Sequence, residues 1–89
     1  MQEKHSIILY SKPGCHLCED AKAALASLAP HFVFSLEERD ITQDAVAFEK
    51  YRYTIPVMQI DGKIQLEARI DVTKLQRALG EGYGPKVKT

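Results

Sequence analysis

Two cysteines, Cys15 and Cys18, are separated by two residues at a junction between an apolar run and an alanine-rich stretch. The apolar run of residues 7–9 predicts a short buried strand, and the alanine- and leucine-rich stretch predicts a helix over residues 15–28. Serine, lysine, proline and glycine at residues 11–14 end the strand and form the turn. The chain must therefore adopt a fold in which a strand leads directly into a helix that begins at a cysteine pair.

Cysteine pairs of this spacing, placed between a strand and a helix, are typical of redox-active sites. The first backbone N–H groups of a helix lack intrahelical partners and can donate to a thiolate, which the helix dipole also favours. Such effects lower the pKa of the attacking thiol in Cys-X-X-Cys sites from about 8.5 to roughly 3.5–7.5. We therefore predict Cys15 as the nucleophile and Cys18, one turn later, as the resolving thiol.

Other uses of the cysteine pair stay open at this point. A metal or iron–sulfur site shared between two chains is one alternative, since a single Cys-X-X-Cys supplies only two of four ligands. An inert pair is the other. Thiol–disulfide exchange between Cys15 and Cys18 needs no metal and no bound organic cofactor, so we expect neither.

The length of 89 residues allows one small domain, which we place at residues 1–80, followed by a flexible tail at residues 81–89. Twelve basic and twelve acidic residues give a net charge of zero, so charge offers no reason to expect binding to nucleic acid or an anionic membrane. Apolar runs are too short for a membrane-spanning helix, and residues 1–6 lack a signal peptide's apolar stretch. We therefore expect a cytoplasmic monomer, and in reducing cytosol a cysteine pair is more often catalytic or metal-binding than structural.

Hydrophobic periodicity and turn residues predict elements in the order β-α-β-α-β-β-α. Strands are expected at residues 5–10, 32–40, 57–60 and 63–68, and helices at residues 15–28, 43–52 and 72–80. Thr42 is the expected cap of the second helix and Asp71 that of the third, while Leu17 and Val72 are expected on buried apolar stripes.

The connections between these elements predict how the strands pair. Strands separated by helices are expected to pair in parallel through right-handed crossovers, whereas Asp61-Gly62 is a strong signal for an antiparallel hairpin. The polar half of the second strand favours an edge position. A four-stranded mixed sheet with helices on both faces follows, which is an α/β architecture of the minimal thioredoxin fold.

A second informative stretch, Thr54-Ile55-Pro56, stands just before the third expected strand. Pro56 can occupy the first position of a strand, and it restricts Ile55 to an extended conformation. Together with the run Tyr-Ser-Lys-Pro-x-Cys-x-x-Cys at residues 10–18 and the hairpin-then-helix ending, this triplet makes residues 5–80 resemble a glutaredoxin or a divergent short glutaredoxin-like protein. The resemblance covers nearly the whole chain.

The resemblance implies roles for several residues. It implies that Pro56 is cis and faces the cysteine pair, and that the backbone of Ile55, which follows Thr54 in the triplet, pairs with the extended backbone of a docked substrate. It also implies that Lys12 pairs with a carboxylate of glutathione and that Asp71 holds the amino group of that tripeptide. We therefore count these residues as candidate substrate-binding residues.

The chain also departs from the glutaredoxin pattern. His16 and Leu17 stand between the cysteines in place of the common Pro-Tyr, and Ala68 and Arg69 replace the glycine pair that usually precedes the last helix. Side chains at the latter positions would crowd the usual path of glutathione. His16 is a further candidate site residue, because its protonated form could stabilise the Cys15 thiolate.

The remaining polar and aromatic candidates have open interpretations. Arg52, Arg69 and Lys12 either ring the site with positive charge or are ordinary solvated residues. Tyr51 and Tyr53 either contact the substrate or pack beneath the proline loop. The two other histidines, His5 and His31, are expected at the surface.

The sequence thus predicts a glutaredoxin-like thiol–disulfide oxidoreductase that reduces disulfides in proteins or in low-molecular-weight thiol compounds. Either glutathione or a protein disulfide reductase would supply the electrons. Two alternatives are a redox-inactive adaptor that holds a partner strand at Thr54-Ile55-Pro56, and a carrier of iron–sulfur clusters.

Overall fold

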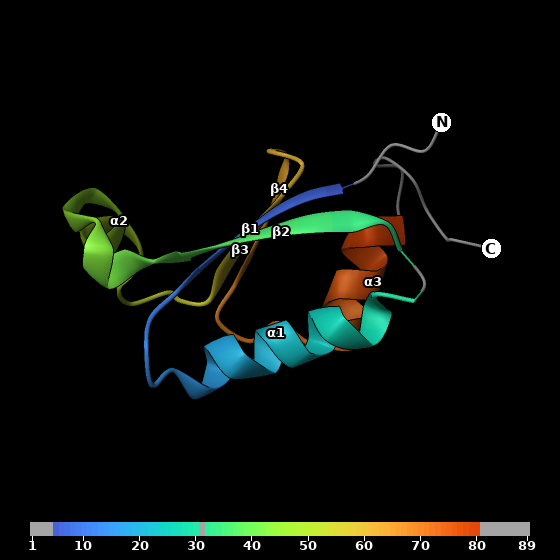
Figure 1. The fold of residues 1–89 in the computed structure, drawn as a ribbon, viewed down its shortest axis with the longest axis horizontal. Coiled ribbons are helices and arrows are strands. Elements are labelled where there is room, and N and C mark those ends of the chain that lie inside the picture. Colours follow the sequence, from blue (N-terminus) through green and yellow to red (C-terminus); the bar gives the residue numbers. More distant parts are fainter. Residues whose placement is uncertain (1–4, 31, 81–89) are drawn as a thin grey trace.

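The computed structural model describes residues 5–30 and 32–80, and its centre is a pair of buried strands, β1 and β3. The expected element order is confirmed, with a 3-10 turn added before the second helix (Figure 1). The bounds are β1 His5–Ser11, α1 His16–Leu28, β2 Phe34–Asp40, η1 Ile41–Gln43, α2 Ala45–Tyr51, β3 Val57–Ile60, β4 Ile64–Glu67 and α3 Val72–Gly80. The tail predicted at residues 81–89 lies outside the described residues, as does His31.

The four strands form one mixed sheet in the order β2-β1-β3-β4, so the polar strand β2 lies at an edge as expected. β1 and β2 are parallel, whereas β3 is antiparallel to both β1 and β4. The expectation that strands separated by helices pair in parallel is therefore wrong for β3. The seven residues of α2 span only about 10 Å, too little to carry the chain back along β2, so β3 begins where β2 ended.

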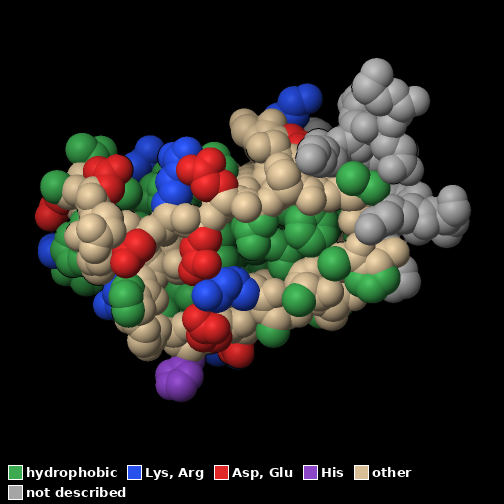
Figure 2. Space-filling model, in the orientation of Figure 1, with side chains coloured by type: hydrophobic (Ala, Val, Ile, Leu, Met, Phe, Trp, Pro, Cys, Tyr) green, Lys and Arg blue, Asp and Glu red, His purple; other side chains and the backbone are tan. Residues whose placement is uncertain are grey.

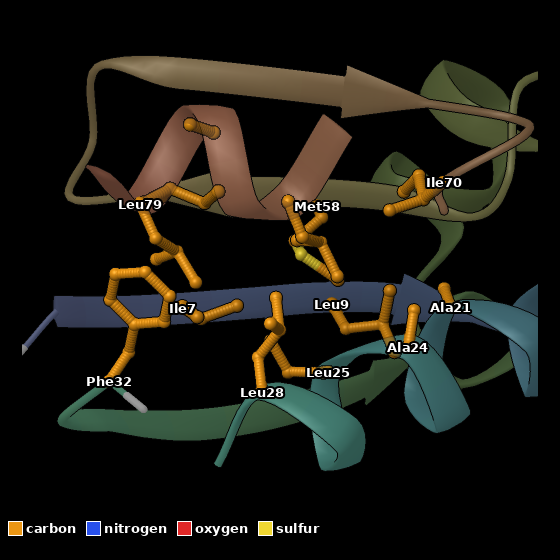
Figure 3. Close-up of a cluster of buried hydrophobic side chains, with 13 residues drawn as sticks. Ile7, Leu9, Ala21, Ala24, Leu25, Leu28, Phe32, Met58, Ile70 and Leu79 are labelled. Carbon is orange, nitrogen blue, oxygen red and sulfur yellow. The ribbon is translucent and has the colours of Figure 1, made fainter. Parts of the chain in front are cut away.

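One face of the sheet is covered by α1 and α3, which lie on the same side of it (Figure 1). Alternate residues of β1 and β3 point toward these helices, because successive side chains of a strand face opposite ways. Figure 3 shows the resulting cluster, in which side chains of α1 meet those of the central strands and of the chain leading into α3. Its fully buried members include Ile7, Leu9, Leu25, Met58 and Leu79.

A smaller apolar cluster on the opposite face holds α2 at one end of the sheet. The register pairs Leu9 with Met58 and Tyr10 with Val57, so the second pair points away from α1 and α3. Val57 packs with buried residues of η1 and α2, and the rings of Tyr10 and Tyr51 are 4.6 Å apart. Helices therefore lie on both faces, as the sequence predicts.

The second helix begins differently from the prediction. Its cap is Asp44, whose carboxylate accepts the backbone N–H groups of Val46 and Ala47. Thr42 instead lies within the 3-10 turn, where its N–H and its hydroxyl both donate to Asp40. The capping prediction for Thr42 is wrong because an aspartate on either side of the turn is the stronger acceptor for the free N–H groups.

Two apolar residues predicted on buried stripes are partly exposed. Leu17 is 37% exposed and Val72 is 39% exposed, although the later members of each stripe are buried. Both lie in the first turn of their helix, where they line a hollow between α1 and the segment that leads into α3. None of the helices within residues 5–30 and 32–80 is long and apolar enough to cross a membrane.

The surface prediction for His5 is wrong. His5 is fully buried at the start of β1, where its Nδ1 lies 2.7 Å from a carboxylate oxygen of Asp61. The other oxygen of Asp61 accepts the backbone N–H of Ser6 at 2.8 Å. Because His5, Ile7 and Leu9 alternate along β1, all three face α1 and α3, and this pattern places the histidine inside.

Candidate dithiol site

Cys15 and Cys18 form a disulfide at the start of α1. Cys15 is the N-cap residue, with extended backbone angles, and its sulfur accepts the backbone N–H of Cys18 at 3.1 Å. The Cys15 carbonyl accepts the N–H of Glu19, which is the first regular bond of the helix. The sulfur that the sequence predicts as the nucleophile therefore lies at the helix end, where free N–H groups point toward it.

The two cysteines differ in exposure. Cys15 is half-buried, whereas Cys18 is only 1% exposed and packs on the inner side of α1. Of the two cysteines, only Cys15 is therefore exposed to molecules in solution. The same N–H that donates to Cys15 in the disulfide can donate to its thiolate after reduction, which favours the charged form.

The register of the sheet brings three loop segments to the same end of the molecule. Tyr10 of β1 pairs with Val57 of β3, and Val57 pairs with Glu67 of β4. The residues after Tyr10, those before Val57 and those after Glu67 therefore leave the sheet side by side. These are residues 11–15 with Cys15, residues 54–56 with the proline, and residues 68–71 before α3.

The proline loop is tied to the segment that leads into α3. The Ile55–Pro56 peptide bond is cis, as the resemblance implies, and Pro56 is fully buried. The N–H of Ala68 lies 3.1 Å from the carbonyl oxygen of Thr54 and 2.8 Å from that of Pro56. Ala68 has a φ of +62°, a backbone conformation that residues with a side chain rarely adopt. Sequence patterns gave no signal for this contact, because the pairing of β3 with β4 creates it.

The backbone of Ile55 is only partly available. Its N–H donates to the Tyr51 carbonyl at 3.1 Å, which closes the last turn of α2. Its carbonyl accepts no backbone hydrogen bond from residues 5–30 or 32–80. A docked strand can therefore donate to the Ile55 carbonyl, while pairing with the N–H requires the turn to open.

A polar network holds the start of the cysteine loop against α1 and β2. The hydroxyl of the buried residue Ser11 donates to Glu38 at 2.9 Å. Lys22 of α1 lies 3.1 Å from Glu38 and 3.0 Å from Glu19. The Ser11 hydroxyl lowers the pKa of Glu38 against the opposing effect of burial, and Lys22 lowers it further. Contacts with Glu19 and Glu38 raise the pKa of Lys22. No sequence pattern indicates this network, since none of these residues belongs to a motif.

The remaining predicted site residues lie around the loop without contacting one another. His16 is exposed in the first turn of α1, and Lys12 is exposed in the loop, where it lines a hollow shared with Glu38. Asp71 caps α3 by accepting the N–H of Lys74 at 2.8 Å. It also lines a groove together with Leu17 from the Cys-X-X-Cys segment.

The two tyrosines before the proline loop have different surroundings. Tyr51 is buried, and its carbonyl accepts the N–H groups of Thr54 and Ile55, so it packs beneath the loop. Tyr53 is 85% exposed, and the guanidinium of Arg52 lies 4.7 Å from the centre of its ring. Figure 2 shows acidic and basic side chains interspersed over the β2 and α2 end of the molecule, so its charge is mixed.

Metal ligands are scarce around the cysteines. Within residues 5–30 and 32–80, no group of three or more histidine, cysteine, aspartate or glutamate side chains could hold a metal ion. One chain therefore supplies at most the two sulfurs of Cys15 and Cys18 from this part of the molecule.

A four-stranded sheet in the order β2-β1-β3-β4, with three helices and a cysteine pair at the start of the first, defines a small thioredoxin-fold protein. Residues 6–80 match the family model described as "Glutaredoxin-like domain (DUF836)". The chain therefore belongs to this glutaredoxin-like family.

Two similar proteins agree with this assignment. The chain is 37% identical over 76 residues to a protein of Dictyostelium discoideum named "Glutaredoxin-like protein YDR286C homolog", covering 79% of this chain and 70% of the relative. Among solved structures, it is similar to the X-ray structure of structural genomics target protein XcR50 from X. campestris, with a TM-score of 0.74 and 26% identity. That similarity covers 86% of this chain and 99% of the other, so the whole domain is shared.

Proposed function

We propose that the protein is a thiol–disulfide oxidoreductase that uses Cys15 as its nucleophile and Cys18 as its resolving thiol. The observation that carries this proposal is the different placement of the two sulfurs. Cys15 is partly exposed at the N-terminus of α1, where its sulfur accepts the N–H of Cys18, while Cys18 is buried on the inner side of the helix. This is the arrangement that a stabilised attacking thiolate and a protected second thiol require.

The reaction consists of two exchanges. The Cys15 thiolate attacks one sulfur of a substrate disulfide, forms a bond to it and expels the other half as a thiolate, which takes up a proton. The Cys18 thiol then loses its proton and attacks the Cys15 sulfur. This step releases the second substrate thiol and leaves the Cys15–Cys18 disulfide, so two electrons have passed to the substrate.

The surrounding residues would hold the substrate in place for these steps. A substrate strand can donate a backbone N–H to the Ile55 carbonyl, beside Thr54 and Pro56, and so add to the edge of the proline loop. The exposed Lys12 would attract acidic groups near the reacting sulfurs, and the exposed ring of His16 could donate a hydrogen bond there. Asp71 caps α3 through one carboxylate oxygen, and its other oxygen would be available to a positively charged group.

The disulfide left on the protein must be reduced by two electrons from outside. Glutathione or a protein disulfide reductase would supply them in the reducing cytosol, where we place the protein as a monomer. The exposed side chains of Ala68 and Arg69 stand where the resemblance implies a glycine pair, and this favours a protein reductase over glutathione.

A redox titration tests the proposal directly. Purified protein is equilibrated in glutathione buffers of set potential, its thiols are alkylated, and the masses of the reduced, disulfide and glutathione-bound forms are measured. We expect clean interconversion of dithiol and disulfide with a midpoint between about −180 and −280 mV, the range of known catalysts of this exchange. A stable glutathione adduct on Cys15 would show that glutathione reaches the site. No interconversion across that range would contradict the proposal and favour the strand-binding adaptor.

A further inference from the structure

A groove of about 540 Å³ opens between α1 and the segment that leads into α3. Ala24 and Ile70, from opposite walls, form its base and also belong to the large apolar cluster (Figure 3). Leu17 and Val72 line it as well, and each is more than one-third exposed. The two residues that the sequence analysis wrongly placed inside the core therefore meet here, as an accessible apolar surface.

The groove is continuous with the dithiol site. Leu17 stands between Cys15 and Cys18 in the chain, on the first turn of the same helix. The opposite wall, residues 69–72, follows Ala68, whose N–H holds the carbonyls of the proline loop. A chain that leaves the proline loop after delivering its sulfur to Cys15 thus has an apolar path along α1.

The size and the rim of the groove suit an extended polypeptide. Along α1 it runs from Leu17 to Ser27, about 15 Å, which equals roughly four or five residues of extended chain. Asp20 on one wall and the guanidinium of Arg69 on the other make no ion pair within residues 5–30 and 32–80. Both remain available to polar groups of an occupant, while Leu17 and Val72 offer apolar contact.

We infer that this groove binds the segment of a protein disulfide substrate that flanks its reactive cysteine and carries an aliphatic side chain. The inference rests on the proposed oxidoreductase function and names its substrate class. The protein therefore selects extended peptide disulfides over small disulfides, which have no chain to lie along the groove. Burial of an aliphatic side chain against Leu17 and Val72 supplies the selectivity.

The test compares two disulfides as oxidants of the reduced protein. One is a mixed disulfide of 2-mercaptoethanol with a nine-residue peptide that has leucines on both sides of a central cysteine; the other is bis(2-hydroxyethyl) disulfide. The second-order rate constants are measured by alkylation and mass spectrometry. Leu17→Ser and Val72→Ser are the test variants. Val46→Ser is the matched control, since Val46 is 75% exposed on α2 and lies outside the groove.

We expect each groove variant to lower the ratio of peptide to small-disulfide rate constants about tenfold, equivalent to about 1.4 kcal/mol. Val46→Ser should leave the ratio within about twofold of the original. An unchanged ratio in both groove variants overturns the inference, and so does an equal fall of both rate constants, which places the effect on the cysteines themselves. If the unmodified protein reacts with neither disulfide, the proposed function itself is wrong.

Discussion

At the amino-terminal end of β1, His5 is buried and paired with Asp61, whereas at the carboxyl-terminal end Cys15 is accessible and the nearby His16 is exposed. Each end also contains one residue other than glycine at a positive φ, Asp61 at +57° and Ala68 at +62°. The hydrogen bonds that the Asp61 carboxylate accepts from the Ser6 N–H and the His5 ring offset the free-energy cost of its positive φ. Ala68 has no side-chain group that could do so.

We therefore distinguish a closed end, which contains His5 and Asp61, from an open end, which contains Cys15, Pro56 and Ala68. Polar groups of the closed end form hydrogen bonds with one another, and these bonds stabilise the folded state. Polar groups of the open end include a Cys15 sulfur and an Ile55 carbonyl that a second molecule can reach. Similar side chains therefore serve stability or stay available to a second molecule according to whether the fold supplies their partners.

The largest expected effect is at the open end. Cys15→Ser should abolish oxidation of the protein by small disulfides, because a serine hydroxyl cannot form the exchanging sulfur bond. Its stability should stay within about 0.5 kcal/mol of the reduced unmodified protein, since the site is partly exposed. Cys18→Ser is the matched variant and should stop at the mixed disulfide on Cys15. Mass spectrometry after reaction with bis(2-hydroxyethyl) disulfide measures both; a mixed disulfide on Cys18 in Cys15→Ser would reverse the assigned roles.

At the closed end, Asp61→Ala should lower the free energy of unfolding by about 2–3 kcal/mol at neutral pH. It removes the charged acceptor of two hydrogen bonds and leaves the buried His5 ring without its Asp61 partner. Asp44→Ala, which removes only the cap of α2, should cost about 1 kcal/mol. Urea unfolding measures both values. Equal costs for the two variants would mean that the closed end has no special stabilising role.

The pH dependence of the free energy of unfolding should differ between Asp61 at the closed end and Glu38 at the open end. Burial alone would raise the pKa of Asp61, but bonds from the Ser6 N–H and the His5 ring lower it below its ordinary value of 3.8. Because the folded-state pKa is lowered, this stabilisation is present above pH 3.8 and is lost as the pH falls through the lowered value.

The stability gap between the unmodified protein and Asp61→Asn should therefore narrow as the pH falls from 5 to about 2, as followed by urea unfolding. Glu38→Gln offers the comparison at the open end, since the pKa of Glu38 is also lowered, first by Ser11 and then by Lys22. The stability difference between the unmodified protein and Glu38→Gln should also narrow as the pH falls. It should narrow by less than for Asp61→Asn, because the Glu38 side chain is 41% exposed. A gap that widens toward acid in either variant would contradict the assigned contacts.

The smallest expected effect concerns Ala68. Glycine adopts a φ of +62° without steric cost, so Ala68→Gly should raise the free energy of unfolding by up to about 1 kcal/mol. Ala26→Gly, at an exposed position inside α1, should instead lower it by about 1 kcal/mol. Thermal unfolding of the reduced proteins measures both shifts. Destabilisation by Ala68→Gly would show that this backbone is not strained.

Local patterns were enough to place the elements and the cysteine pair. The strand–turn–helix junction located Cys15 at the first turn of α1, and Asp61-Gly62 located the hairpin between β3 and β4. The capping role of Asp71 also follows from its position just before the helix. Each of these features depends on neighbours within a few residues, so the sequence alone contains the necessary information.

The partners of distant residues were decided only by the tertiary structure. The antiparallel direction of β3 follows from how far a short α2 can carry the chain, and the bond from Ala68 to the proline loop follows from that direction. The burial of His5, the contact of Ser11 with Glu38 and the groove between Leu17 and Val72 likewise depend on elements that meet only after folding. Periodicity states which side of an element is apolar, but only packing decides how far along its length that side is covered.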